Sequence, residues 1–249
     1  MQTYQFKESK SLKKTDGKKK SSLFGIPKLD DANNAGGKHS QKCTLILTEG
    51  DSAKAMAIAG ISVVGRDNYG VFPLRGKVIN AREKITTKIG IDQVSKNQEL
   101  IAMKKILGLE QNVKYTDTSK LRYGHILIMC DQDLDGSHIK GLLINWLTTF
   151  WPELAKIPGF ISCMNTPIVK MLNKKKEVMF YSLQDYETWK EQHPLFKKDG
   201  WNAKYFKGLG TSTTTEAKEY FKNMKCMNYL WDSKSDDAID LAFNKNRSD

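Results

Sequence analysis

Residues 124–136 have the sequence Gly-His-Ile-Leu-Ile-Met-Cys-Asp-Gln-Asp-Leu-Asp-Gly, and this stretch decides the fold. Its first half is an unbroken apolar run rich in β-favouring residues, which predicts a buried strand. Its second half carries three aspartates at alternate positions. A long helix is expected to follow from Ser137 to about Trp151, because Pro152 cannot continue it.

The same order of strand, polar loop and helix occurs once before in the chain. Residues 44–48 predict a second buried strand that ends at Glu49, and residues 51–59 predict a helix that Gly60 terminates. Strands that alternate with helices indicate βα units on a parallel sheet. We therefore predict an α/β domain over residues 43–161, with a Rossmann-like parallel sheet flanked by helices.

Residues 162–249 show a mixed pattern. Apolar runs on both sides of the polar turn at residues 173–176 predict a β-hairpin, and a capped helix is expected after it. Residues 201–206 predict a further strand, and Thr213 begins another helix. The sequence therefore predicts an α+β extension after the first domain.

Residues 1–42 differ in composition from the rest of the chain. They carry ten lysines against four acidic residues, which is half of the net charge of +12 of the whole chain. Large apolar residues are few, so this segment is expected to be an unstructured basic linker or tail. The exception is residues 25–32, Gly-Ile-Pro-Lys-Leu-Asp-Asp-Ala, which are too specific for a featureless linker.

Composition excludes several classes of protein. No run of about 18 apolar residues occurs, so no membrane span is predicted, and the N-terminus lacks the apolar core of a signal peptide. The four cysteines form no C-x-x-C pair, which argues against a zinc site or a disulfide framework. The excess of positive charge suggests a polyanionic partner.

Four carboxylates are expected to crowd one edge of the sheet. Glu49 ends one predicted strand, and Asp131, Asp133 and Asp135 follow the other. Parallel strands end at a shared edge, where α/β proteins form their ligand sites. Neighbouring carboxylates repel one another and call for a cation. Oxygen ligands with few fixed protein contacts suit Mg²⁺, which keeps part of its water shell and binds phosphate.

Two other interpretations of the aspartates compete with a magnesium site. The pattern Asp-x-Asp-x-Asp-Gly also begins a calcium-binding EF-hand loop, but the twelfth position is Leu142 instead of glutamate, and a strand precedes the motif. The aspartates could instead only cap the following helix. Capping would explain Asp135 but not all four carboxylates together.

Two basic strings favour a phosphodiester ligand beside such a metal. Arg75, Lys77 and Asn80 surround Gly76, whose missing side chain admits a close backbone approach. Lys207 begins a loop of glycines and hydroxyls directly before a predicted helix N-terminus, which suits phosphate oxygens. Either string alone could be an ordinary charged turn.

The segment Glu49-Gly-Asp-Ser-Ala53 together with Asp131-x-Asp-x-Asp135 resembles the Toprim fold of topoisomerases and primases. Longer strings are similar to type IIA DNA topoisomerases, and closer to eukaryotic topoisomerase II than to bacterial gyrase B. The strings that carry this resemblance are Gly25-Ile-Pro-Lys-Leu-Asp-Asp-Ala-Asn33, residues 44–54, Pro73-Leu-Arg-Gly-Lys77, residues 135–145 and residues 205–213.

This resemblance implies ATP-dependent passage of one duplex through a double-strand break in another. Glu49, Asp131 and Asp133 would be the catalytic and metal-binding residues, with Asp135 as a further acidic ligand. The ion would be Mg²⁺, with Mn²⁺ or Ca²⁺ as substitutes. Glu49 would also serve as general acid–base for the 3′-oxygen. The residues expected to contact duplex DNA are Arg75, Lys77, Asn80, His138, Lys140 and Lys207.

The resemblance further implies a full-length enzyme that is a nuclear homodimer and that uses ATP. The chain itself is expected to lack the ATPase region and the winged-helix domain with its nucleophilic tyrosine. Arg122-Tyr123 does not replace that nucleophile, because it leads into the central strand. We therefore expect residues 43–161 to be a Toprim domain and residues 162–249 to be its extension, a fragment inactive alone. The alternatives are a free-standing Toprim nuclease or primase and a non-catalytic DNA-binding module.

Overall fold

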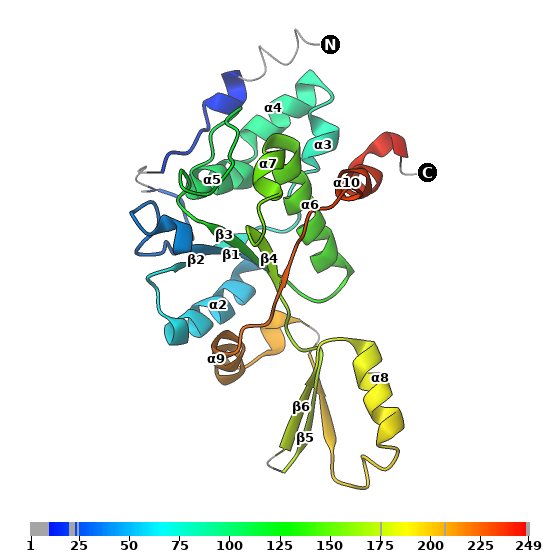
Figure 1. Ribbon diagram of the computed structural model, residues 1–249. Helices are drawn as coiled ribbons and strands as arrows, with labels where there is room; N and C mark the ends of the chain where they lie inside the picture. Colours follow the sequence, from blue (N-terminus) through cyan, green and yellow to red (C-terminus); the bar gives the residue numbers. More distant parts are fainter. Residues whose placement is uncertain (1–9, 20–22, 24, 175, 207, 248–249) are drawn as a thin grey trace.

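A five-stranded sheet forms the centre of the chain in the computed structural model, which describes residues 10–19, 23, 25–174, 176–206 and 208–247 (Figure 1). The strand order is β2-β1-β3-β4-β8, and all neighbours are parallel except β4 and β8. The strands are β1 (Thr44–Glu49), β2 (Tyr69–Leu74), β3 (His125–Met129), β4 (Ile161–Met164) and β8 (Cys226–Asn228). The predicted α/β fold with a mostly parallel sheet is confirmed.

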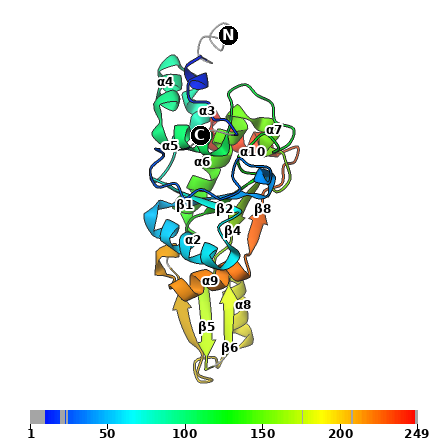
Figure 2. The same cartoon turned by 90° about the vertical axis from the view of Figure 1, so that its left-hand side faces the viewer.

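Helices cover both faces of this sheet. The helices α2 (Gly50–Val64) and α9 (Thr214–Lys222) lie on one face (Figure 2). The other face carries α3 (Ala81–Lys84), α4 (Lys88–Lys96), α5 (Gln98–Leu107), α6 (Leu134–Phe150) and α7 (Pro152–Ala155). Side chains at alternate positions enter opposite cores, so Ile46 packs beneath α2 while Leu45 and Leu47 pack beneath α5 and α6. Burial on both faces explains why the strands are apolar throughout.

Gly60 lies inside α2 and does not end it, contrary to the expectation from sequence. The helix continues to Val64, and Gly65 with φ of 91° follows it. A Cβ atom on Gly60 would lie 2.0 Å from Cδ2 of Phe221 on α9. The glycine therefore permits close packing of α2 against α9.

A second, three-stranded antiparallel sheet projects away from the first (Figures 1 and 2). Its order is β6-β5-β7, formed by β5 (Val169–Asn173), β6 (Lys176–Phe180) and β7 (Asn202–Tyr205), and α8 (Leu183–Gln192) packs on it. Lys204 of β7 forms an ion pair with Glu216 of α9 at 2.6 Å. This contact links the three-stranded sheet to α9, and both lie within the predicted α+β extension of residues 162–249.

The described part of residues 1–42 packs against the domain, which differs from the expected unstructured arm. The hydroxyl of Tyr123 contacts the carboxylate of Asp31 and accepts a hydrogen bond from Ala32 N. The buried ammonium of Lys104 lies 2.6 Å from Asp16. The sequence did not predict this packing, because the segment has few large apolar residues and polar contacts provide much of its attachment.

The structure also describes the helices and thiols that bear on chain class. Among the described residues, no helix is long and apolar enough to cross a membrane. The four cysteines are free thiols; Cys226 is exposed and the other three are buried.

Candidate functional site

Glu49 and Asp131 meet at the carboxyl edge of the parallel sheet. Thr48 of β1 is the register partner of Met129 of β3, so the residues that follow these two strands are neighbours. The backbone N–H of Asp131 donates to Oε2 of Glu49 at 3.3 Å. The acidic residues that the sequence placed at two strand ends are therefore in direct contact.

The other two aspartates belong to the start of α6. Asp133 is the N-cap residue, and its Oδ1 accepts a hydrogen bond from Gly136 N at 2.8 Å. Asp135 is exposed in the first turn. Because the helix begins at Leu134, residues 131–142 do not form the continuous loop of an EF-hand.

The electrostatics of Glu49 show that these carboxylates influence one another. Burial raises the pKa of Glu49, and the hydrogen bond from the amide of Asp131 opposes this effect. The negative charges of Asp131, Asp133 and Asp135 raise the pKa of Glu49 further. A cation at this edge would relieve that repulsion.

The carboxylates do not form a complete metal-coordination sphere. Among the described residues, no group of three or more His, Cys, Asp and Glu side chains converges in a way that could hold a metal ion. The donor chemistry nevertheless fits a hard cation, because all four side chains offer carboxylate oxygens. An ion that keeps several waters and shares phosphate oxygens needs few protein ligands, which is the behaviour of Mg²⁺.

A loop from the C-terminal part of the chain holds the Asp131 side chain. Leu209 N donates to Oδ1 of Asp131 at 2.7 Å. A Cβ atom on Gly208 would lie 2.3 Å from Oδ2 of the same carboxylate. Leu209 is itself buried against α2. The orientation of Asp131 therefore depends on residues outside the βα units, a dependence that sequence analysis did not identify.

The first basic string reaches the acidic edge through Lys77. Its Nζ lies 2.6 Å from Oδ1 of Asp135, and this contact lowers the pKa of that carboxyl group. Arg75 lies on the same loop and is exposed, while its backbone N–H is bound by the Glu99 side chain. Of the predicted DNA contacts on this loop, Lys77 presents its cation beside the carboxylates, and Arg75 is exposed on the same loop.

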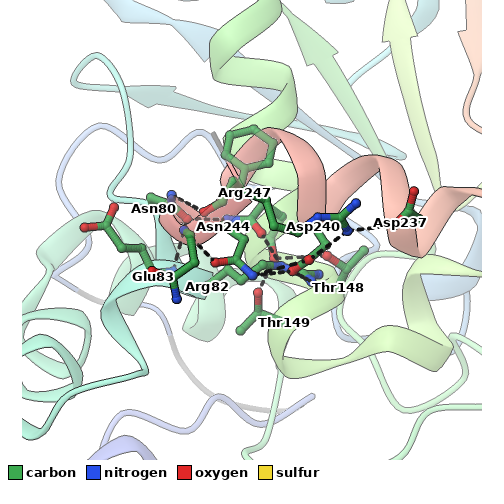
Figure 3. Close-up of polar contacts among 12 residues, drawn as sticks. Asn80, Arg82, Glu83, Thr148, Thr149, Asp237, Asp240, Asn244 and Arg247 are labelled. Atoms are coloured by element: carbon green, nitrogen blue, oxygen red, sulfur yellow. Dashed lines mark hydrogen bonds and ion pairs between the residues drawn. The ribbon is translucent and has the colours of Figure 1, made fainter. Parts of the chain in front are cut away.

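Asn80 occupies a different position from the one expected of a DNA contact (Figure 3). Its Oδ1 accepts from Asn145 Nδ2 at 2.8 Å and from Glu83 N at 3.4 Å, as the N-cap of α3. Its Nδ2 donates to the carbonyl of Phe243 at 2.8 Å, at the end of α10 (Ser235–Phe243). Both ends of the amide are engaged within the chain, so Asn80 connects the basic loop to α6 and α10.

The helix α10 is held by further polar contacts in the same network. Arg82 donates to Asn145 and forms an ion pair with Asp240 at 3.2 Å, and Arg247 contacts Asp237 and Asp240 (Figure 3). Sequence analysis found no pattern in this region. The periodic apolar residues of α10 are few, and polar partners distant in sequence fix its position.

The two predicted contacts on α6 differ from each other. His138 is exposed, and its ring stacks with that of Phe243 at a centroid distance of 6.4 Å. Lys140 is only 8% exposed, and its Nζ points to Oε1 of Gln132 at 3.5 Å. The expectation that Lys140 touches DNA does not fit this burial. Lys207 lies outside the described residues.

Two families of known domains match adjoining parts of the chain. The Toprim domain matches residues 44–161, and the C-terminal associated domain of TOPRIM matches residues 164–249. DNA topoisomerase 2 of Pisum sativum is 53% identical over 248 residues, which are 98% of this chain and 16% of that protein. DNA topoisomerase 2 of Saccharomyces cerevisiae is 50% identical over 248 residues, which are 97% of this chain and 17% of that protein.

A solved structure supports the same relationship. The DNA-binding, cleavage and re-ligation domain of topoisomerase II from Plasmodium falciparum is similar with a TM-score of 0.84 and 51% sequence identity. The match covers 92% of this chain and 31% of that chain. The present chain therefore spans only a part of the relatives that it matches.

Proposed function

Because the chain belongs to the eukaryotic DNA topoisomerase 2 family, of which it is the Toprim region, we propose that its acidic edge is half of a DNA cleavage–religation site. In this proposal, Glu49, Asp131 and Asp133 bind Mg²⁺, and Asp135 is a further acidic group. Mn²⁺ or Ca²⁺ would substitute for Mg²⁺, because both accept oxygen ligands.

The observation that carries this proposal is the contact between the acidic and the basic parts of the edge. The amide of Asp131 is bound to Glu49, while Lys77 reaches Asp135 from a separate loop. Carboxylates that hold a cation and lysines that bind phosphate are the two components needed to hold a phosphodiester at a metal.

The residues divide the chemistry between them. A bound divalent ion would polarise the phosphate and stabilise the leaving oxygen. Glu49 would exchange a proton with the 3′-oxygen. Arg75, Lys77 and Lys207 would neutralise DNA phosphates, and exposed His138 would contact the same duplex.

The proposal also covers the activity of the full-length protein. We expect the full-length enzyme to pass one duplex through a double-strand break in another at the expense of ATP, as a homodimer in the nucleus. The 249-residue chain alone would neither cut nor relax DNA, because none of its tyrosines lies in the winged-helix context expected of the nucleophile. A free-standing nuclease or primase and a non-catalytic module are not favoured by the comparisons.

The test uses the full-length protein with Asp131→Ala and the matched variant Asp92→Ala. Asp92 is exposed on α4 and pairs only with Lys96 among the described residues, one turn away. Plasmid cleavage should disappear in Asp131→Ala, with most duplex binding retained, and should persist in Asp92→Ala. Metal-dependent nicking by the purified 249-residue chain that Asp131→Ala abolishes would instead establish a free-standing nuclease.

A further inference from the structure

The far end of the three-stranded sheet gathers lysines from two separate segments. The β5–β6 turn contributes Lys174 and Lys176, and the loop after α8 contributes Lys197 and Lys198. Nδ2 of Asn173 donates to the carbonyl of Asp199 at 2.9 Å, which holds the two segments side by side (Figure 1). We call these four lysines the basic tip.

The lysines of the basic tip differ from others in the same subdomain because they are unpaired. All four are exposed, and none lies within ion-pair distance of a carboxylate among the described residues. By contrast, Lys170, Lys190 and Lys204 each have a carboxylate partner at 2.5–2.6 Å. Glu177, which adjoins the turn, forms an ion pair with Lys170.

The strand β7 (Asn202–Tyr205) runs from the basic tip towards the part of the chain that binds Asp131. The strand β7 begins at Asn202, which pairs with Leu172 near the tip. Gly208 follows this strand, and a Cβ atom on it would lie 2.3 Å from Asp131 Oδ2. Six residue steps lead from Asn202 to Gly208, and at about 3.3 Å per step they limit the span to about 20 Å. The same length of duplex contains about six base pairs at about 3.4 Å each.

From this arrangement we propose that the basic tip is a second contact for the duplex bound at the acidic edge, about six base pairs away. The inference rests on the proposed function and adds a surface to it. The partner is the phosphate backbone, because exposed ammonium groups recognise charge and not sequence.

The variant that tests this proposal replaces all four lysines of the basic tip with glutamine. Its matched control replaces four exposed lysines of α4 and of the loop before β3 with glutamine, namely Lys88, Lys96, Lys114 and Lys120. Both variants of the 249-residue chain lose the same charge. Thermal unfolding monitored by circular dichroism checks that each is folded, and the double variant Lys197→Gln/Lys198→Gln repeats the test if the quadruple variant is not.

The first measurement is the affinity for a 30-base-pair duplex over a range of salt concentrations. Each phosphate neutralised makes the slope of log K against log salt steeper by about 0.9. The slope of the basic-tip variant should therefore be shallower than that of wild type by about two to four. The control variant should leave the slope nearly unchanged. Equal slopes for the two variants would overturn the proposal.

The second measurement locates the contact in the full-length protein. Single methylphosphonate substitutions remove one phosphate charge at a time from a duplex that is cleaved at a defined position. Substitutions about five to seven base pairs from that position should weaken binding of the wild-type protein several-fold and should not weaken binding of the basic-tip variant. A uniform response along the duplex would contradict the proposal.

Two controls separate the possible failures. If Asp131→Ala abolishes cleavage while the basic-tip variant binds DNA like wild type, the proposed function stands and this inference fails. Poly-glutamate serves as a probe for an acidic protein partner. Loss of poly-glutamate binding in the basic-tip variant with unchanged duplex binding would assign the surface to such a partner and overturn the proposal.

Discussion

The backbone amide of Asp131 donates to the side chain of Glu49, although 82 residues separate them in the chain. The contact exists because β1 and β3 are parallel neighbours that end at the same level. Each residue follows a strand whose apolar side chains are buried on both faces, so the fold itself brings the two carboxylates together. The acidic edge is therefore a consequence of the βα architecture, and its repulsion is built into the folded state.

Replacement of Glu49 by glutamine should stabilise the chain while abolishing cleavage by the full-length protein. The pKa of Glu49 is raised in the folded state, so folding favours the protonated form. The corresponding stability is present at low pH and is lost as pH rises through the raised pKa. Glutamine mimics the protonated form, so the melting temperature of Glu49→Gln should exceed that of wild type at pH 7.

The measurement is thermal unfolding of both chains without metal between pH 3 and pH 8. The difference should vanish below the ordinary pKa of glutamate, where wild-type Glu49 is protonated in both states. Addition of Mg²⁺ should stabilise wild type more than the variant. A variant that is less stable at pH 7 would show that Glu49 is not destabilised by its neighbours.

Gly208→Ala should disturb the acidic edge although it replaces none of the four acidic residues. The added Cβ would lie 2.3 Å from Asp131 Oδ2, so either the loop or the carboxylate must move. We expect a loss of stability of about 1–3 kcal/mol and at least a tenfold loss of cleavage by the full-length protein. Urea unfolding and plasmid cleavage measure the two effects.

The control for this change is Gly210→Ala, two residues further along the same loop. Its new Cβ would lie 3.9 Å from Cβ of Ser52, an ordinary contact. Cleavage should remain within a few-fold of wild type. If both alanine variants lose cleavage equally, the flexibility of the loop matters and not the orientation of Asp131.

Asn80→Ala should weaken the fold more than it weakens DNA binding. The substitution removes a helix cap, an Asn145 contact and the bond to Phe243, with an expected cost of about 1–3 kcal/mol. Urea unfolding should detect this loss, while the duplex affinity of the folded variant at fixed salt should stay close to wild type. A clear loss of duplex affinity in the fully folded variant would restore Asn80 as a direct contact.

The spacing of apolar residues predicted the helices and strands whose apolar side chains are buried against the sheet. The apolar runs of β1 and β3 and the pattern of α5 are visible because their side chains fill the cores next to the sheet. The interruption expected at Gly60 was wrong, because the sequence does not show that Phe221 packs there. The glycine serves instead to let Phe221 pack closely against α2, and the sequence alone does not distinguish this role from that of a helix end.

The site was less predictable than the sheet. The positions of the four carboxylates followed from strand ends, whereas the roles of Asn80 and Lys140 as DNA contacts were expected from the resemblance to type IIA topoisomerases. Side-chain direction decides such roles: the amide of Asn80 is used by α10, and Lys140 turns into the interior. No sequence pattern shows which way a polar side chain points when its partner lies more than a hundred residues away.

The ion pair between Lys77 and Asp135 should limit DNA binding in the absence of metal. Its atoms lie 2.6 Å apart, and the lysine lowers the pKa of the carboxyl group. In this state the carboxylate neutralises the ammonium that would otherwise displace a counterion from DNA. Asp135→Asn should therefore steepen the slope of log K against log salt by up to about 0.9, and Lys77→Gln should flatten it or leave it unchanged.

The matched control is Asp92→Asn, which breaks the exposed pair between Asp92 and Lys96 at 2.7 Å on α4. It frees one lysine, as Asp135→Asn does, but far from the acidic edge. Exposed pairs contribute little to stability, so both variants should fold like wild type. If the slope increases equally in both, the gain reflects net charge alone. If the slope steepens only in Asp135→Asn, Lys77 binds phosphate once its carboxylate partner is removed. A cation bound to Asp135 would free Lys77 for phosphate in the same way.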